Sequence, residues 1–251
     1  MKKIIQKSLL SIAVFAVGAS FAHQTTKWGV QDIERPQPQV VTPGATDNAA
    51  PSDAIVLFDG TNLSEWKSCN DGGEAKWKLK DGYMEIVPGT GDIHTRQLFG
   101  SCQVHIEWSI IDEDLNEEGN DFGNSGVFLM ERYELQILDS YEKATYPDAQ
   151  AGAIYGQSPP QVNVCKKPGQ WQSYDIIFHA PIFSGEKVIK TATITVFHNG
   201  VLIQDNWEIW GATYLTPPVP YVVHDAKMPL RLQEHHHAMR YRNIWIRSLD
   251  G

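Results

Sequence analysis

The 251-residue sequence has few cysteines, little positive charge and no long hydrophobic run. Its three cysteines, Cys69, Cys102 and Cys165, form no C-x-x-C pair, so neither a thiol-redox site nor a cysteine zinc site is supported. No stretch approaches the roughly 20 apolar residues that a membrane-spanning helix requires. The 21 Lys and Arg residues against 30 Asp and Glu residues give a net charge of −9. This acidity argues against a nucleic-acid partner, which favours a basic face.

The first 22 residues have the pattern of a secretory signal peptide. Met1-Lys2-Lys3 is basic, an apolar run follows from about Leu9 to Val17, and small residues flank the end at Ser20-Phe21-Ala22. The apolar run is too short for a stable membrane span. We therefore expect residues 1–22 to be removed on export to the periplasm, with full secretion as the alternative.

Two further segments differ in composition. Residues 23–52 are rich in Pro, Gln, Thr and Ala and cannot bury enough surface to offset the entropy of ordering, which predicts a flexible or draped arm. Residues 53–251 have the length of one large domain. In an oxidising compartment, the three cysteines of this domain suggest one disulfide and one buried thiol, but the sequence does not choose the pair.

Short strand-like runs separated by turns recur through this domain, and no stretch has clean helical periodicity. The pair Asn199-Gly200 between two alternating runs is the strongest hairpin signal. The expected strands span 55–58, 77–80, 83–86, 103–110, 125–130, 133–138, 173–179, 192–198, 201–207, 228–234 and 241–248. About a dozen short strands without helices predict an all-β sandwich or barrel.

Two of these strands carry polar residues on one face. Successive side chains of a strand point to opposite faces. The segment 133–138 therefore places Tyr133, Leu135 and Ile137 toward a core, and Arg132, Glu134 and Gln136 on the other face. A second polar row follows at Arg231, Gln233 and His235. A carboxylate beside amides and a guanidinium is typical of a carbohydrate cleft, although a solvated outer face is the alternative.

A series of short motifs occurs in a fixed order along the chain. They are FDGTNLSEW at 58–66, WKLKDG at 77–82, GNSG at 123–126, YELQILDS at 133–140, AIYG at 153–156, WQSYD at 171–175, HNGV at 198–201, LRLQEH at 230–235 and YRNIWI at 241–246. From about Asp53 to Leu249 the chain resembles the 3-keto-disaccharide hydrolase domain family. The resemblance implies a concanavalin A-like jelly-roll β-sandwich of two antiparallel sheets. It also implies an exported bacterial enzyme that acts on glycosides oxidised to a ketone at C3.

Such a substrate changes which catalytic groups are needed. Ordinary glycoside hydrolysis uses two carboxyl groups, whereas the strand around Glu134 offers one. A ketone at C3 acidifies the hydrogen on C2, so one base can start an elimination that expels the group at C1. We expect Glu134 or His235 to be that base. Gln136, Gln233 and Arg242 would bind sugar hydroxyls or stabilise the oxyanion, and all five side chains should converge on one pocket.

Further substrate contacts are expected from loops and strand ends. The candidates are Asn124, Asp139, Tyr155 and Asn163. Asn124 and Asp139 have turn-shaping as their alternative role, and Arg242 a buried salt bridge. Histidines 235 and 237 could bind a divalent metal as a His-x-His pair, but a polar loop at a strand end is favoured. We therefore predict no metal ligands and no cofactor, and metal dependence is left open. A non-catalytic lectin-like module and a conventional endo-glycosidase are the alternative functions, and the oligomeric state is left open.

Overall fold

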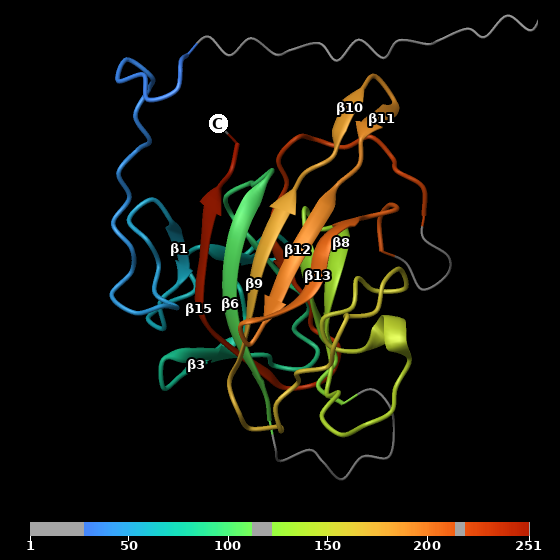
Figure 1. Ribbon diagram of the computed structural model, residues 1–251. Helices are drawn as coiled ribbons and strands as arrows, with labels where there is room; N and C mark the ends of the chain where they lie inside the picture. Colours follow the sequence, from blue (N-terminus) through green and yellow to red (C-terminus); the bar gives the residue numbers. More distant parts are fainter. Residues whose placement is uncertain (1–27, 112–121, 214–218, 251) are drawn as a thin grey trace, which may run out of the picture. The chain divides into compact units, whose positions relative to one another are not determined.

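The computed structural model describes residues 28–111, 122–213 and 219–250 (Figure 1). The predicted signal peptide lies outside these residues. The chain divides into two compact units, Met1–Val40 and Val41–Gly251. Residues 28–40 of the first unit contain turns and bends but neither helix nor strand. The strands of the described residues all belong to the second unit.

The second unit is built on a large antiparallel sheet, which occupies the foreground of Figure 1. Its strands follow the order β13-β12-β9-β6-β15-β4-β3, and β1 pairs with β15. Their bounds are β1 Ile55–Phe58, β3 Lys78–Lys80, β4 Tyr83–Glu85, β6 Cys102–Ile110, β9 Gln172–His179, β12 Thr193–His198, β13 Val201–Glu208 and β15 Met239–Ser248. We call this layer sheet A.

A smaller antiparallel sheet, sheet B, has the strand order β2-β5-β14-β7-β8. Its bounds are β2 Trp66–Ser68, β5 Ile93–Thr95, β7 Ser125–Leu129, β8 Tyr133–Ile137 and β14 Arg231–Leu232. A separate hairpin of β10 Ile182–Ser184 and β11 Lys187–Lys190 projects between β9 and β12 (Figure 1). The only helical element among the described residues is the 3-10 turn η2, Pro147–Ala149. No helix in the described part of the chain is long and apolar enough to cross a membrane.

The two sheets pack face to face around a hydrophobic core. Tyr241 of sheet A and Ser125 of sheet B form a hydrogen bond between their hydroxyl groups, at 2.6 Å. The Tyr174 hydroxyl donates to the Gln136 carbonyl across the same interface, at 2.8 Å. Trp66 and Trp108 are fully buried, as expected of core aromatics. The structure thus confirms the predicted β-sandwich, and its two antiparallel layers are consistent with a jelly roll.

Most predicted strands are present within a few residues of their expected bounds. The Asn199-Gly200 hairpin is confirmed: both residues have positive φ, 52° and 79°, and they join β12 to β13. The short strands β2, β5, β10 and β11 were not expected from the sequence. Three or four residues are too few to display a period-2 pattern, so these strands exist because neighbouring strands pair with them.

Two expectations from composition have different outcomes. The disulfide is wrong, because Cys69, Cys102 and Cys165 are all free thiols located in different parts of the sandwich. Cys102 begins β6 in the core, Cys69 follows β2 in the other sheet, and Cys165 lies in the loop before β9. The end of the predicted arm, residues 41–52, belongs to the same compact unit as the sandwich. Within that unit the Asn48 carbonyl accepts a hydrogen bond from the Trp245 indole, at 2.9 Å.

Candidate functional site

A row of polar and aromatic side chains crosses the face of sheet B directed away from the core. The strand register aligns one residue from each strand: Lys67, His94, Arg231, Phe128 and Glu134. Their neighbours in the adjacent row, among them Leu135, Val127 and Leu232, point inward and are buried in the core. Side-chain alternation therefore places these five residues, which we call the Glu134 row, on one face.

A second row on this face contains two of the predicted binding residues. Gln136 lies opposite Gly126 in the β7–β8 pair, and the Gln233 backbone NH donates to the Gly126 carbonyl, at 3.1 Å. A Cβ on Gly126 would lie 2.5 Å from Glu134 Oε1, so only glycine leaves room for the carboxyl group there. The structure thus brings Glu134, Gln136 and Gln233 together on one sheet face.

Glu134 is a buried carboxyl group, with 5% of the residue exposed. Its backbone NH donates to the Thr213 hydroxyl, at 3.0 Å. Within the described residues, its carboxyl has no hydrogen-bond or ion-pair partner. Burial raises the pKa of Glu134 from its ordinary value of 4.5 to about 8; Arg231 opposes this rise and Asp92 adds to it. A carboxyl with this pKa can take up or release a proton near neutral pH.

Arg231 is the cation nearest to this carboxyl in the row. Its guanidinium pairs with Asp92 and lies 3.7 Å from the centre of the Phe128 ring. Because Asp92 compensates its charge, Arg231 lowers the pKa of Glu134 by less than burial raises it. The Arg231 Nε is buried and has no hydrogen-bond partner among the described residues. This arrangement leaves a planar, charged donor group available to an oxygen of a bound molecule.

A pocket of about 350 Å³ opens beside this row. It is lined by Phe128, Glu131, Arg132, Ala212, Thr213, Met228 and Arg231. Its volume falls at the lower end of the roughly 300–1,000 Å³ typical of small-molecule sites. Phe128 and Thr213 both adjoin Glu134, one as its cross-strand neighbour and the other through its hydroxyl. The pocket therefore adjoins two neighbours of Glu134, which is not itself a lining residue, and two guanidinium groups, those of Arg132 and Arg231, line it.

The other predicted contacts lie outside this row. Asp139 pairs with Lys143 at 2.5 Å and accepts a hydrogen bond from the Tyr141 NH, which is turn-shaping geometry. The Asn163 amide donates to the Ser140 carbonyl, at 2.7 Å, and so holds two loops together. The Tyr155 NH donates to the Glu134 carbonyl, at 3.3 Å, so Tyr155 lies along the free edge of β8. Asn124 immediately precedes β7, at the end of that strand opposite the β7–β8 turn.

Arg242 does not join Glu134, Gln136 and Gln233, so the prediction that all five side chains converge on one pocket is wrong for Arg242. It lies on β15 of sheet A, where its neighbour Tyr241 points into the core and Arg242 therefore points away from it. Arg242 pairs with Glu107 at 2.6 Å and lies 4.1 Å from the centre of the Trp171 ring. Of the roles considered from the sequence, this geometry matches the salt-bridge partner.

His235 lies in the loop between β14 and β15, three residues beyond the end of β14. Its ring centre is 5.9 Å from that of His236. The histidine run thus lies in the loop that joins β14 to β15.

Three site residues were missed by sequence reasoning: Asp92, His94 and Cys69. They lie on or beside the two short strands β2 and β5, which the sequence does not signal. The only local cue was His94, a polar residue between Ile93 and Thr95, which both face the core. Burial raises the pKa of the Cys69 thiol to about 12, and Asp92 and Glu131 add to this, so Cys69 is not a thiolate nucleophile at neutral pH.

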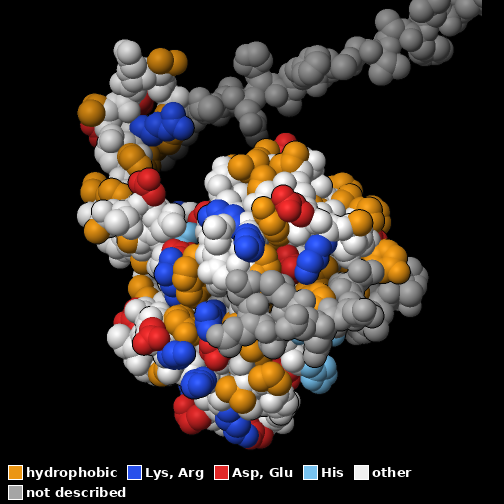
Figure 2. Space-filling view, turned by 90° about the horizontal axis from the view of Figure 1, so that it is seen from below, with side chains coloured by type: hydrophobic (Ala, Val, Ile, Leu, Met, Phe, Trp, Pro, Cys, Tyr) orange, Lys and Arg blue, Asp and Glu red, His pale blue; other side chains and the backbone are white. Residues whose placement is uncertain are grey.

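The surface charge agrees with the composition. On the face shown in Figure 2, the described Lys and Arg side chains are interspersed with Asp, Glu and hydrophobic side chains. That face has no continuous basic surface of the kind that binds nucleic acid.

Comparison with known proteins places the chain in a family. The model of a 3-keto-alpha-glucoside-1,2-lyase-like domain matches residues 53–247, which is most of the sequence. The chain belongs to this family. The matched segment contains every residue of the Glu134 row, and it agrees closely with the extent of the resemblance seen in the sequence.

Solved structures of this fold come from Parabacteroides distasonis. A candidate glycosyl hydrolase of that organism is 42% identical, with a TM-score of 0.82 over 88% of this chain and 95% of that one. Two others are 22% and 23% identical, with TM-scores of 0.58 and 0.56 over 79% and 78% of this chain and 94% and 99% of theirs, and these show the fold alone. No functionally curated protein matches the sequence.

Proposed function

We propose that this protein is an exported carbohydrate-active enzyme that cleaves the glycosidic bond of 3-keto-glycosides. The observation that carries the proposal is the buried Glu134 carboxyl, whose pKa of about 8 lies near physiological pH and whose neighbours Phe128 and Thr213 line a pocket. Strongly perturbed carboxyl groups in such positions are typical of active sites. Membership of the lyase-like family and the glycosyl hydrolase name of the 42% identical relative support the same class of reaction.

The reaction begins with proton transfer at C2. The Glu134 carboxylate takes the C2 proton, and the electrons of the C–H bond pass to the C3 carbonyl oxygen to give an enolate. When the C3 carbonyl re-forms, a C1–C2 double bond forms and the C1–O bond breaks. The departing oxygen takes a proton from water or from His235, the second predicted catalytic group. Water then adds at C1 and a proton returns to C2, which completes a net hydrolysis.

The neighbouring residues suit the charge that develops in this reaction. The Arg231 guanidinium stabilises the enolate oxygen, the role that the sequence had suggested for Arg242. The amide groups of Gln136 and Gln233 bind sugar hydroxyls. A base with a pKa near 8 is stronger than an ordinary carboxylate, although only about one tenth of it is ionised at pH 7.

The test compares a 3-keto-glucoside with its parent glucoside, with the release of the aglycone as readout. We expect release from the keto sugar alone, and a loss of at least about 100-fold in kcat/KM in Glu134→Gln, since general-base catalysis contributes about 10²–10⁴-fold. Binding of the keto sugar without release would instead identify a lectin-like module. Equal release from the parent glucoside would identify a conventional glycosidase.

The matched control is Glu208→Gln on β13, which removes an exposed carboxyl group from the other sheet. It should leave aglycone release unchanged.

Export is tested separately, by fractionating cells that express the full chain: residues 1–22 should be absent from periplasmic protein. Retention of the uncleaved chain in the cytoplasm would contradict this part of the proposal.

A further inference from the structure

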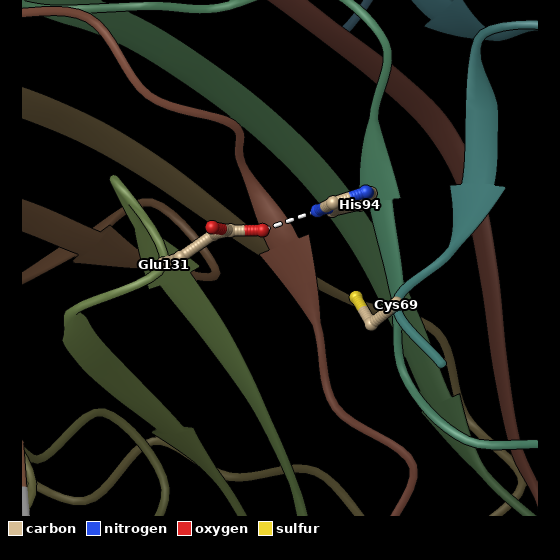
Figure 3. Close-up of side chains that lie close together, drawn as sticks. All are labelled: Cys69, His94 and Glu131. Atoms are coloured by element: carbon tan, nitrogen blue, oxygen red, sulfur yellow. Dashed lines mark hydrogen bonds and ion pairs between the residues drawn. The ribbon is translucent and has the colours of Figure 1, made fainter. Parts of the chain in front are cut away.

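Three metal-ligating side chains from distant parts of the chain meet next to the Glu134 row. Cys69 follows β2, His94 lies in β5, and Glu131 lies in the turn between β7 and β8. Their sulfur, nitrogen and oxygen atoms all lie within 4.8 Å of one another. In Figure 3 the His94 ring and the Glu131 carboxylate point toward one another, and the Cys69 thiol faces the space beside them.

The spacing of these atoms fits a single ion. Zinc binds sulfur at about 2.3 Å and nitrogen or oxygen at about 2.0–2.2 Å, which places tetrahedral ligand atoms roughly 3–4 Å apart. His94 Nδ1 and Glu131 already form a hydrogen bond, so the imidazole and the carboxylate are correctly aimed. The other ring nitrogen, Nε2, is buried and has no hydrogen-bond partner among the described residues. Small side-chain rotations would bring all three groups onto one ion.

The backbone that holds Glu131 in place is strained. Met130 and Glu131 both have left-handed φ angles, 54° and 56°. Such two-residue turns favour Asn and Gly, and this chain uses Asn199-Gly200 at its other tight hairpin. Left-handed conformations of other residues cost about 1–3 kcal/mol each and occur mostly at functional sites. The strained turn projects the Glu131 carboxylate over His94.

The surrounding charges are compatible with a cation. Arg231 is compensated by Asp92, so its charge does not oppose an ion. Lys67 is the remaining basic residue in the row, as the cross-strand neighbour of His94. A bound ion would displace the proton of the Cys69 thiol, and the resulting thiolate and the Glu131 carboxylate would together balance a divalent charge. A thiolate and an imidazole in the same set favour zinc over magnesium or calcium, which prefer oxygen ligands alone.

We propose that Cys69, His94 and Glu131 form a binding site for a zinc-class divalent ion. Three protein ligands leave a fourth coordination position for water or a ligand oxygen. Because Glu131 also lines the pocket, this position faces the pocket in which a substrate would bind. The site goes beyond the proposed function and does not depend on it: the ion can bind whether or not the protein cleaves a sugar.

The experiment uses the full chain, stripped of metal with a chelator and kept reduced, and adds Co²⁺ as a spectroscopic stand-in for zinc. We expect a thiolate-to-cobalt charge-transfer band that saturates at stoichiometric cobalt and is displaced by zinc. Cys69→Ser should abolish the band. Loss of a residue outside the ligand shell already lowers metal affinity about 10–100-fold, so His94→Gln and Glu131→Gln should each weaken cobalt binding by at least about 100-fold.

Matched controls are Cys165→Ser, which removes a free thiol in the loop before β9, and His236→Gln in the β14–β15 loop. Both should keep the band. Thermal unfolding of the metal-free proteins identifies any variant that fails to fold. If Cys69→Ser fails to fold, His94→Gln serves in its place. The absence of a band in the wild type, its persistence without Cys69, or its loss only in a control variant would overturn the site. None of these readouts depends on sugar cleavage, so failure of the metal site and failure of the proposed function are distinguishable.

Discussion

Replacing Glu134 with glutamine should stabilise the protein in a pH-dependent way. The folded pKa is raised, from 4.5 to about 8, so the contribution of this carboxyl to stability is fully present below pH 4.5 and is lost as the pH rises through 8. Between these values the unfolded chain releases the proton while the folded protein keeps it. Each pKa unit corresponds to about 1.36 kcal/mol. The whole rise therefore corresponds to about 5 kcal/mol, of which about 3 kcal/mol is already lost at pH 7.

The measurement is the free energy of unfolding in urea, for wild type and Glu134→Gln, at several pH values between 4.5 and 8.5. The difference between the two proteins cancels the other titrating groups. We expect this difference to increase by about 4 kcal/mol in favour of the variant across that range. A chelator is present throughout, because a bound cation would also act on the carboxyl.

A difference that stays constant with pH would refute the reasoning, because it would mean that Glu134 has the same pKa in the folded and unfolded chains. Exposed Glu208→Gln controls for the loss of one carboxyl group, and its effect should stay within about 0.5 kcal/mol at each pH. A variant that is more stable but inactive would agree with a carboxyl retained for chemistry at the expense of stability.

Further predictions concern the same face. Gly126→Ala should lower kcat/KM at least about 10-fold and destabilise the fold by about 1–3 kcal/mol, because the new Cβ would lie 2.5 Å from Glu134 Oε1 and 2.9 Å from Phe128 Cε2. Enzyme kinetics measure the first effect and urea unfolding the second. An unchanged kcat/KM would show that activity does not require the carboxyl group to be held in this position. Arg231→Gln should raise the pKa of Glu134 further and Asp92→Asn should lower it, which carboxyl NMR titration can follow; shifts in the opposite directions would contradict the charge assignment. The kcat/KM for a 3-keto-glucoside should rise with pH to a midpoint near 8, since the base must be ionised, whereas a fall above pH 8 would make Glu134 the general acid.

The site illustrates how burial and charge pairing act together. Arg231 lies in the same row as Glu134, and an unpaired guanidinium there would hold the carboxyl ionised and at a low pKa. Asp92 takes up much of that charge, so burial dominates and the carboxyl remains protonated in most molecules at pH 7. Burial is thus the main cause of the raised pKa of Glu134, and the charges of Arg231 and Asp92 modify it in opposite directions.

The local sequence was sufficient to predict the strands and the direction of their side chains. The alternation in Tyr133–Ile137 correctly placed Glu134 and Gln136 on the face away from the core, since a strand has a fixed period of two. The Asn-Gly pair predicted its hairpin because few other residues adopt positive φ at low energy. The order of motifs was enough to identify the family, which the family model confirms.

Strand pairing was decided only by the tertiary structure. Arg242 and Gln233 both lie on polar strand faces in the sequence, yet β15 joins sheet A while Gln233 extends from β14 in sheet B. Likewise, Cys69, His94 and Glu131 are separated by 25 and 37 residues, and they meet only because β2, β5, β14 and β7 pair in that order. Side-chain periodicity is a local property of the backbone, whereas register and sheet order depend on contacts between distant segments. For that reason the sequence alone could place Glu134 and Arg231 on polar strand faces, but it could not show that they meet, or that Asp92 and the three-ligand cluster lie beside them.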